Sequence, residues 1–579
     1  MVVAATLASA PHVEAVTRTW DGGGVDNNWS TPANWSADTL PVVGDTVTFN
    51  ATSTKNATID VPVTIATFQM VAGYTGIVTQ SNTFTLTTSY TQSAGTFNGA
   101  GPAINITGGT TVNAGGTFNG GSSGITLTGA LTVNAGGAFT STSATLTVTG
   151  AVTFAAGVFT HNGGTVVFST SSVTLNLGGA ATFNNVQLLS GTKTISAANT
   201  MTVLGTLTLT GGAVNTGTIA PQGDISVAST FTGGSGTLLI NGGGAQAWTG
   251  GGSGSDLPLV NINKGGGTLT MTGTFRTTRN WTWTAGTVAA SGSTVIFAAA
   301  LTVAGTHTLG AVEMAGGIVT IATGTTLTAS GMVTLTSGSL NQGGATGTLA
   351  AQGDISSASG FTGGTATLLI NGAGAQAWTG SAGGATDLPV VNINKGGGTL
   401  TITGTLRTTR NWTWTAGGMA ASGSTVIFAG TQTITGSHSL GAVEIRGGTI
   451  TIASGTTLTV TGSLNLFSGT INTGTLAAQA SVDAQIGFTG GGTATLLING
   501  NGAQTLTGFH TSTTGALPNV DISKPSGTLT IAGTLRTGRN WTYTSGGLTV
   551  AGSTLVFTAG TITGSHSLGA VEIRGGTIT

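Results

Sequence analysis

The amino-acid sequence predicts an all-β protein built as a β-solenoid, on three observations. Apolar positions recur every 20 or 21 residues between residues 100 and 210, apolar residues alternate with Thr inside each unit, and long segments of the chain repeat almost unchanged. Alternation with a period of two is typical of β-strands, and self-similarity at a fixed period is typical of stacked repeats. We therefore expect a right-handed parallel β-helix with coils of about 20 residues, each carrying about three short strands.

The 20-residue period is visible as three ladders of apolar residues that run in phase. The first ladder comprises Ile104, Ile125, Leu146, Val166, Val186 and Leu207; the second comprises Val112, Val133 and Phe154; the third comprises Phe118, Phe139 and Phe159. Gly, Asn and Ala separate the ladders and are typical of turns. If each coil stacks on the previous one, the ladders become inward apolar stacks and the intervening Thr residues face outward. An array of β-sandwiches would instead need a modular period of roughly 80–100 residues.

A second, longer repeat of about six coils is superimposed on the short one. Residues 433–451 recur letter for letter as residues 561–579, and the Arg-Asn-Trp-Thr-Trp segment at residue 279 returns at 410 and, with Tyr last, at 539. We divide the chain by this repeat into the segments 1–17, 18–100, 101–163, 164–292, 293–423, 424–552 and 553–579. The repeats 164–292, 293–423 and 424–552 are called the first, second and third repeat below, and the segment 553–579 is a truncated copy.

Composition excludes several classes of function. The chain of 579 residues has 101 Gly, only 14 Lys and Arg against 15 Asp and Glu, and a formal net charge of −1. This charge provides no field that would attract nucleic acid or an anionic membrane. The chain has no Cys, so disulfides and thiolate metal sites are excluded. No apolar run approaches the ~20 residues that span a bilayer. We expect no nucleic-acid partner, no membrane span and no cofactor.

The two ends differ from the repeated coils. Residues 1–17 are small and apolar, typical either of an export-signal remnant or of an ordinary leader. Residues 18–49 contain Trp20, Trp29 and Trp35, and we expect this segment to cap the first coil, with sugar binding by the three rings as the alternative. The sequence stops within a repeat, which predicts either further repeats or the stacking of another subunit.

The N-terminal segment also carries a family resemblance. The pattern Trp20-Asp21-Gly22-Gly23, Asn28-Trp29, Asn34-Trp35, Pro41 and Gly44-Asp45 resembles the opening of large secreted bacterial surface proteins. These are the autotransporter-associated β-strand-repeat proteins and the related haemagglutinin-like adhesins. The match covers about 30 residues. The resemblance implies an exported protein with a role at the cell surface.

Charged residues recur with the long repeat and are the candidates for chemistry. The His–Glu pairs are His307 and Glu313, His438 and Glu444, and His566 and Glu572; the Arg pairs are Arg276 and Arg279, Arg407 and Arg410, and Arg536 and Arg539. Such groups could serve a polysaccharide lyase, but a catalytic site needs several groups that converge on one cleft. Three copies along a coil favour surface ion pairs or subunit contacts. We predict no catalytic, cofactor-binding or metal-binding residues, and no enzyme.

The recurring Trp-Thr-Trp segments have a structural and a binding interpretation. We expect one Trp of each pair to face the core and the other to lie at the surface. The surface ring could stack on a sugar. The sequence thus predicts an extracellular structural solenoid that forms or extends a cell-surface fibre or adhesive stalk by self-association. A carbohydrate-binding adhesin, with surface glycans as partners, is the alternative, and a polysaccharide-degrading enzyme is the less favoured one.

Overall fold

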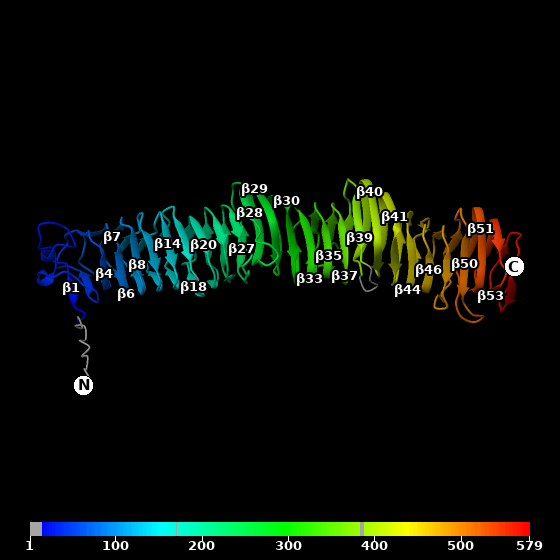
Figure 1. The fold of residues 1–579 in the computed structure, drawn as a ribbon, viewed down its shortest axis with the longest axis horizontal. Helices are drawn as coiled ribbons and strands as arrows, with labels where there is room; N and C mark the ends of the chain where they lie inside the picture. The colour runs from blue at the N-terminus through cyan, green and yellow to red at the C-terminus, as the bar shows by residue number, and fades with distance from the viewer. Residues whose placement is uncertain (1–13, 170, 382–386) are drawn as a thin grey trace, which may run out of the picture. The chain divides into compact units, whose positions relative to one another are not determined.

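A computed structural model describes residues 14–169, 171–381 and 387–579 of the chain. Most of the expected leader, residues 1–13, lies outside the described residues. The protein is all-β and forms a parallel β-solenoid of about 24 turns with roughly 21 residues per turn, as the sequence predicted (Figure 1). Two short 3-10 helices, η1 (Pro32–Asn34) and η2 (Ser36–Asp38), are the helical elements of the described chain. The chain forms two compact units that divide near residues 279–289.

In the first unit the coils between residues 103 and 221 carry three short strands each, and the predicted ladders are confirmed residue by residue. β8 (Ala103–Ile106), β11 (Gly124–Leu127) and β14 (Thr145–Val148) pair in parallel and place Ile125 between Ile104 and Leu146. The ladder continues through β17 (Thr165–Phe168), β20 (Asn185–Leu188) and β23 (Leu207–Leu209). The second ladder follows β9 (Gly109–Val112), β12 (Leu131–Val133) and β15 (Val152–Phe154). The sequence period therefore equals one turn of the coil.

The third ladder forms a separate sheet of six strands, and its last four strands carry a stack of aromatic rings. Its strands are β3 (Ala57–Ile59), β5 (Ile77–Gln80), β7 (Thr96–Gly99), β10 (Thr117–Asn119), β13 (Ala138–Thr140) and β16 (Phe159–Thr160). The ring of Phe118 lies 5.2 Å from that of Phe97 and 4.7 Å from that of Phe139, with nearly parallel planes. Offset stacking of aromatic rings adds to the free energy gained by burying them.

The N-terminal segment buries its three tryptophans beneath irregular backbone. Trp20 and Trp35 are fully buried and Trp29 is nearly so. Their rings pack edge to face at 5.1 and 4.5 Å, and Phe49 of β2 (Thr46–Phe49) stacks on Trp20. The indole Nε1 of Trp35 donates to the carbonyl of Trp29. The three rings therefore belong to the core and present no free face to a sugar.

The second unit differs from the expectation of short strands. Two kinds of long strand recur with the repeat, and most of them span nearly a whole coil. The first kind is β40 (Val390–Thr408) and β51 (Asn519–Thr537), which corresponds to β29 (Leu259–Thr277) of the first unit; the second kind is β30 (Trp281–Phe297), β41 (Trp412–Phe428) and β52 (Trp541–Thr549). The pairing of β40 with β41 shifts register between Asn394 and Thr399, so the ladder turns a corner at Gly396–Gly398 without ending. Glycine in these positions bends the strand rather than interrupting it.

Candidate functional site

The recurring histidines are buried against the first tryptophan of each Trp-Thr-Trp segment. Trp412 is fully buried, and its indole Nε1 donates to Nε2 of His438 at 3.1 Å. Trp281 and His307 repeat this bond at the same distance. The second rings, Trp283 and Trp414, are only half-buried and stack on the same histidines. Each pair has one buried and one half-buried ring, as expected, but both rings contact the same histidine, which joins them.

The hydrogen bonds of these histidines fix their protonation state. In His438, Nδ1 donates to the carbonyl of Gly436 at 2.7 Å while Nε2 accepts from Trp412, so the ring is neutral. If Nε2 also carried a proton, it would face the indole N–H, and two hydrogen-bond donors would then oppose each other. Burial lowers the pKa of His438, and likewise that of His307, below the usual value of 6.5. A group of this kind is a poor candidate for general acid or base chemistry.

The protein should lose stability as the pH falls below about 6.5. In the unfolded chain a histidine binds a proton near pH 6.5, whereas folded His307 and His438 do not, so the unfolded state binds more protons and unfolding becomes easier. Each histidine contributes up to about 1.4 kcal/mol per pH unit in this window. Denaturant midpoints measured between about pH 8 and pH 5 will show the slope.

The substitution that tests this pH dependence is His438→Gln, because glutamine does not titrate. It should reduce the difference in bound protons between the unfolded and folded states by up to one, and so reduce the slope of stability against pH. Equal slopes for the wild type and His438→Gln would show that the Trp412–His438 contact does not control acid stability.

The remaining candidates do not gather around the histidines. Glu313 accepts from Thr336 at 2.8 Å, Glu444 pairs with Arg446 at 2.6 Å, and Glu572 pairs with Arg574. No described hydrogen bond or ion pair joins Arg407 or Arg410 of the second repeat to His438 or Glu444 of the third. Over the described residues, no group of three or more His, Asp or Glu side chains could hold a metal ion. The described residues therefore contain no cluster of Arg, His and Glu side chains of the kind that the lyase hypothesis requires.

Each repeat contains a buried lysine cage, defined as a lysine ammonium bound by two glycine carbonyls and a glutamine amide. Lys395 is 2% exposed, and its Nζ donates to the carbonyls of Gly372 and Gly374 at 2.7 and 2.9 Å and to Oε1 of Gln376 at 2.6 Å. The glutamine Nε2 then donates to the carbonyls of Ala351 and Gly353 in the coil before. The same cage forms around Lys264 with Gln246 and around Lys524 with Gln504.

The cages neutralise no charge, because no ion pair of the described chain involves a lysine. Three acceptors satisfy the three N–H groups of each ammonium, which is the condition for burying it. Burial lowers the pKa of Lys264, Lys395 and Lys524 below the usual 10.5. Each cage joins three successive layers of the coil and is therefore a structural link.

A different cluster in the first and second repeats binds an aspartate. The carboxylate of Asp256 accepts from the backbone N–H of Thr278 at 2.9 Å and from its hydroxyl at 2.6 Å, and Arg276 lies 3.7 Å away. Asp387, Thr409 and Arg407 repeat this arrangement at 2.8, 2.5 and 3.8 Å. Backbone amide, hydroxyl and guanidinium together form a complete carboxylate site.

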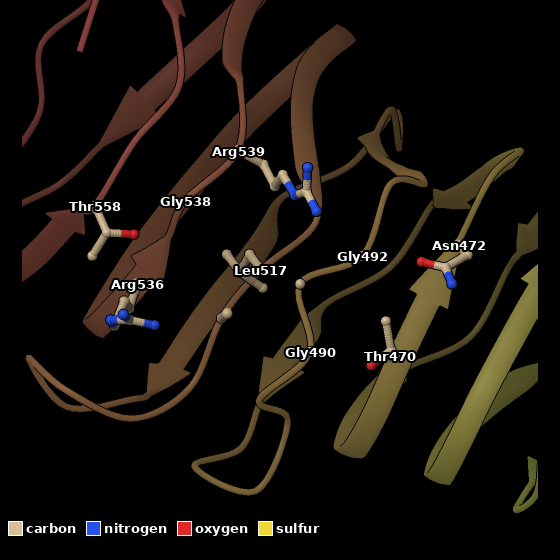
Figure 2. Close-up of a pocket in the computed structure, with 11 residues that line it drawn as sticks. Thr470, Asn472, Gly490, Gly492, Leu517, Arg536, Gly538, Arg539 and Thr558 are labelled. Carbon is tan, nitrogen blue, oxygen red and sulfur yellow. The ribbon is translucent and has the colours of Figure 1, made fainter. Parts of the chain in front are cut away.

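The third repeat keeps the arginine of this cluster but lacks its partners. Ala516 stands where the other repeats have Asp, and Gly538 stands where they have Thr. The two truncations coincide with a pocket of about 380 Å³. Six of its lining side chains are Thr470, Asn472, Leu517, Arg536, Arg539 and Thr558. Figure 2 shows Arg536 and Arg539 on one side of this arginine pocket and Thr470 and Asn472 on the other.

The arginine pocket carries uncompensated positive charge. Arg536 donates through Nη1 to the carbonyl of Gly515 at 2.8 Å, but its buried Nε has no hydrogen-bond partner, and no described carboxylate pairs with Arg536 or Arg539. The neighbouring ring of His510 accepts from the backbone N–H of Arg536 at 3.1 Å. Burial, together with the charge of Arg536, lowers the pKa of His510 to about 4, so this ring is neutral at pH 7.

Comparison with known proteins does not identify a function for these residues. No protein-family model matches the chain, no curated protein is detectably similar to it, and no solved structure matches it. In the part of the chain that the structure describes, helices long and apolar enough to cross a membrane are not found. The candidate functional site therefore stands on the arrangement of the residues themselves.

Proposed function

We propose that the chain is an extracellular structural β-solenoid that forms or extends a cell-surface fibre or adhesive stalk. The observation that carries this proposal is how three ionic or imidazole groups of the second and third repeats are used. Lys395, Arg407 and His438 are each engaged within or between coils, by a cage, an aspartate and a tryptophan respectively. Groups used in this way link one layer of the coil to the next and support a mechanical role.

The duplicated block supports the same role. A repeat of about 130 residues adds about six coils each time it is copied, and a solenoid gains length without changing the contacts of any coil. The N-terminal resemblance to secreted bacterial surface proteins agrees with an extracellular location. Self-association into filaments remains a prediction. A carbohydrate-binding adhesin is the second candidate, because the outer rings Trp283 and Trp414 remain half-buried and keep an accessible edge.

The location and the mechanical role can be tested together by deleting one repeat. Residue 424 repeats residue 293, so deletion of residues 293–423 should preserve the pairing of successive coils while removing about six of them. Immunogold labelling of intact cells that make the protein should detect both the full-length chain and the shortened chain at the surface. Electron microscopy should show that the shortened chain is reduced in length by about 29 Å, from six coils at about 4.8 Å each.

Two results would contradict the proposal. Labelling that requires cell lysis would show that the protein is not at the surface. Release of unsaturated sugars from a polysaccharide, lost on His438→Gln or Arg410→Gln, would show that the chain is an enzyme rather than a fibre. Retention of the full-length protein on a glycan array, with no filaments in the microscope, would instead favour the adhesin.

A further inference from the structure

We propose that the arginine pocket of the third repeat binds the carboxylate of an acidic sugar, a uronic acid being the simplest example. This proposal concerns a ligand site and holds whether or not the chain forms a surface fibre. It is argued from the difference between the three repeats, from the charge left in the third, and from the polarity of the pocket walls.

The first two repeats show what this position in the coil binds. There the chain supplies its own carboxylate, Asp256 or Asp387, to a threonine N–H, a threonine hydroxyl and an arginine. The third repeat retains the arginine as Arg536 and the backbone amide as that of Gly538, but has no carboxylate at Ala516. The chain has thus kept two of the groups that bind a carboxylate and opened the space that the carboxylate occupied.

Electrostatics favours an anion in that space. The Nε of Arg536 is buried without an acceptor, so the chain itself leaves this guanidinium incompletely hydrogen-bonded. Arg539 lines the same pocket, and no described carboxylate forms an ion pair with either guanidinium. Carboxylates bind guanidinium groups through paired, charge-assisted hydrogen bonds.

The other walls of the pocket select a hydroxylated ligand. Thr470, Asn472 and Thr558 offer hydroxyl and amide groups, and Leu517 offers a small apolar surface. Thr558 of the truncated copy replaces the alanine found at residues 298 and 429, so the pocket gained a hydroxyl oxygen beside the position that lost the aspartate. The volume of about 380 Å³ lies within the range of about 300–1,000 Å³ common for small-molecule sites. A sugar ring bearing a carboxylate matches this combination of charge, hydroxyls and size.

The experiment uses the full chain and three probes in ligand-observed NMR titrations: glucuronate, glucose and acetate. We expect glucuronate to bind, glucose to show no binding, and acetate to bind at least tenfold more weakly than glucuronate. Absence of glucuronate binding, or equal binding of glucose, would overturn the proposal. Equal binding of acetate and glucuronate would overturn its sugar component and leave a simple carboxylate site.

The repeats themselves supply the control variants. Ala516→Asp with Gly538→Thr restores the residues of the first two repeats, so this double variant should fold and should bind glucuronate at least tenfold more weakly. The converse pair, Asp387→Ala with Thr409→Gly, should open a second site at Arg407 and raise the stoichiometry from one to two. Unchanged binding in the first double variant would place the ligand elsewhere and refute the assignment.

Discussion

Gln376→Leu is expected to destabilise the second repeat by about 3–5 kcal/mol. The substitution removes the acceptor that lies 2.6 Å from the Lys395 ammonium and two hydrogen bonds to the preceding coil. The ammonium would remain buried with two acceptors for three N–H groups and with no carboxylate near it. Hydrogen–deuterium exchange of peptides covering residues 348–408, followed by mass spectrometry, will report the loss locally.

Two further measurements separate the charge of Lys395 from the shape of the site. Adding Lys395→Met to Gln376→Leu removes the uncompensated ammonium and should recover part of the lost stability. Raising the pH should also recover part of the stability lost in Gln376→Leu. The folded pKa of Lys395 lies below the unfolded value of 10.5, so between these values the unfolded chain binds more protons and stability rises with pH.

Gln342→Leu is the control for this series, since Gln342 is half-exposed on a strand of the same repeat, β35 (Val333–Gln342). It should change stability by less than about 0.5 kcal/mol, as surface substitutions usually do. If Gln376→Leu costs no more than Gln342→Leu, the lysine cage is not a structural link.

The architecture of the coil was predictable because the spacing of apolar residues in the sequence repeats with each turn. One turn of the solenoid equals one period of the sequence, so Ile104, Ile125 and Leu146 had to fall in register once the strands stacked. Strand alternation does not account for the different burial of Trp412 and Trp414, because it places residues i and i+2 on the same face, and both rings contact His438. The long strands of the second unit were not predicted, because glycine was taken to end a strand where it only bends one.

The lysine cages were accessible to sequence reasoning but were not found by it. Gln376 precedes Lys395 by 19 residues, close to one coil, so the period alone places the two side chains in adjacent layers. What the sequence does not reveal is that both side chains face inward, since lysine and glutamine are ordinarily surface residues. Their burial depends on carbonyl groups of a Gly-x-Gly turn whose direction is set by the three-dimensional coil.

The arginine pocket was not predicted for a different reason. The sequence predictions rested on residues that are the same in each repeat, whereas the pocket lies where the third repeat differs, at Ala516 and Gly538. Alignment of the three repeats would have revealed both substitutions. It would not have revealed the resulting cavity, because neighbouring side chains can close around a truncated residue or leave the space open.

Gly436→Ala is the second substitution for which we expect a large effect. Gly436 has φ +84°, and a Cβ added there would lie 1.8 Å from the backbone carbonyl oxygen of Trp414 in the adjacent coil. Gly305 and Gly564 occupy the same position in the other repeats, with added Cβ atoms 1.8 and 1.9 Å from the corresponding carbonyls. Because this carbonyl is backbone, relief requires the two coils to move apart. The contact therefore limits how closely successive coils approach.

Gly455 is the control that distinguishes the steric contact at Gly436 from the backbone strain of a positive φ alone. Gly455 has φ +75° but open space around its would-be Cβ, so Gly455→Ala should cost about 1–2 kcal/mol from backbone strain alone. Gly436→Ala should cost about 1–3 kcal/mol more, as overpacked sites do. It should also weaken the bond between Trp412 and His438, since Nδ1 of His438 donates to the carbonyl of Gly436. Denaturant midpoints and tryptophan fluorescence will show both effects, and equal losses in the two variants would mean that the coils are not in limiting contact at Gly436.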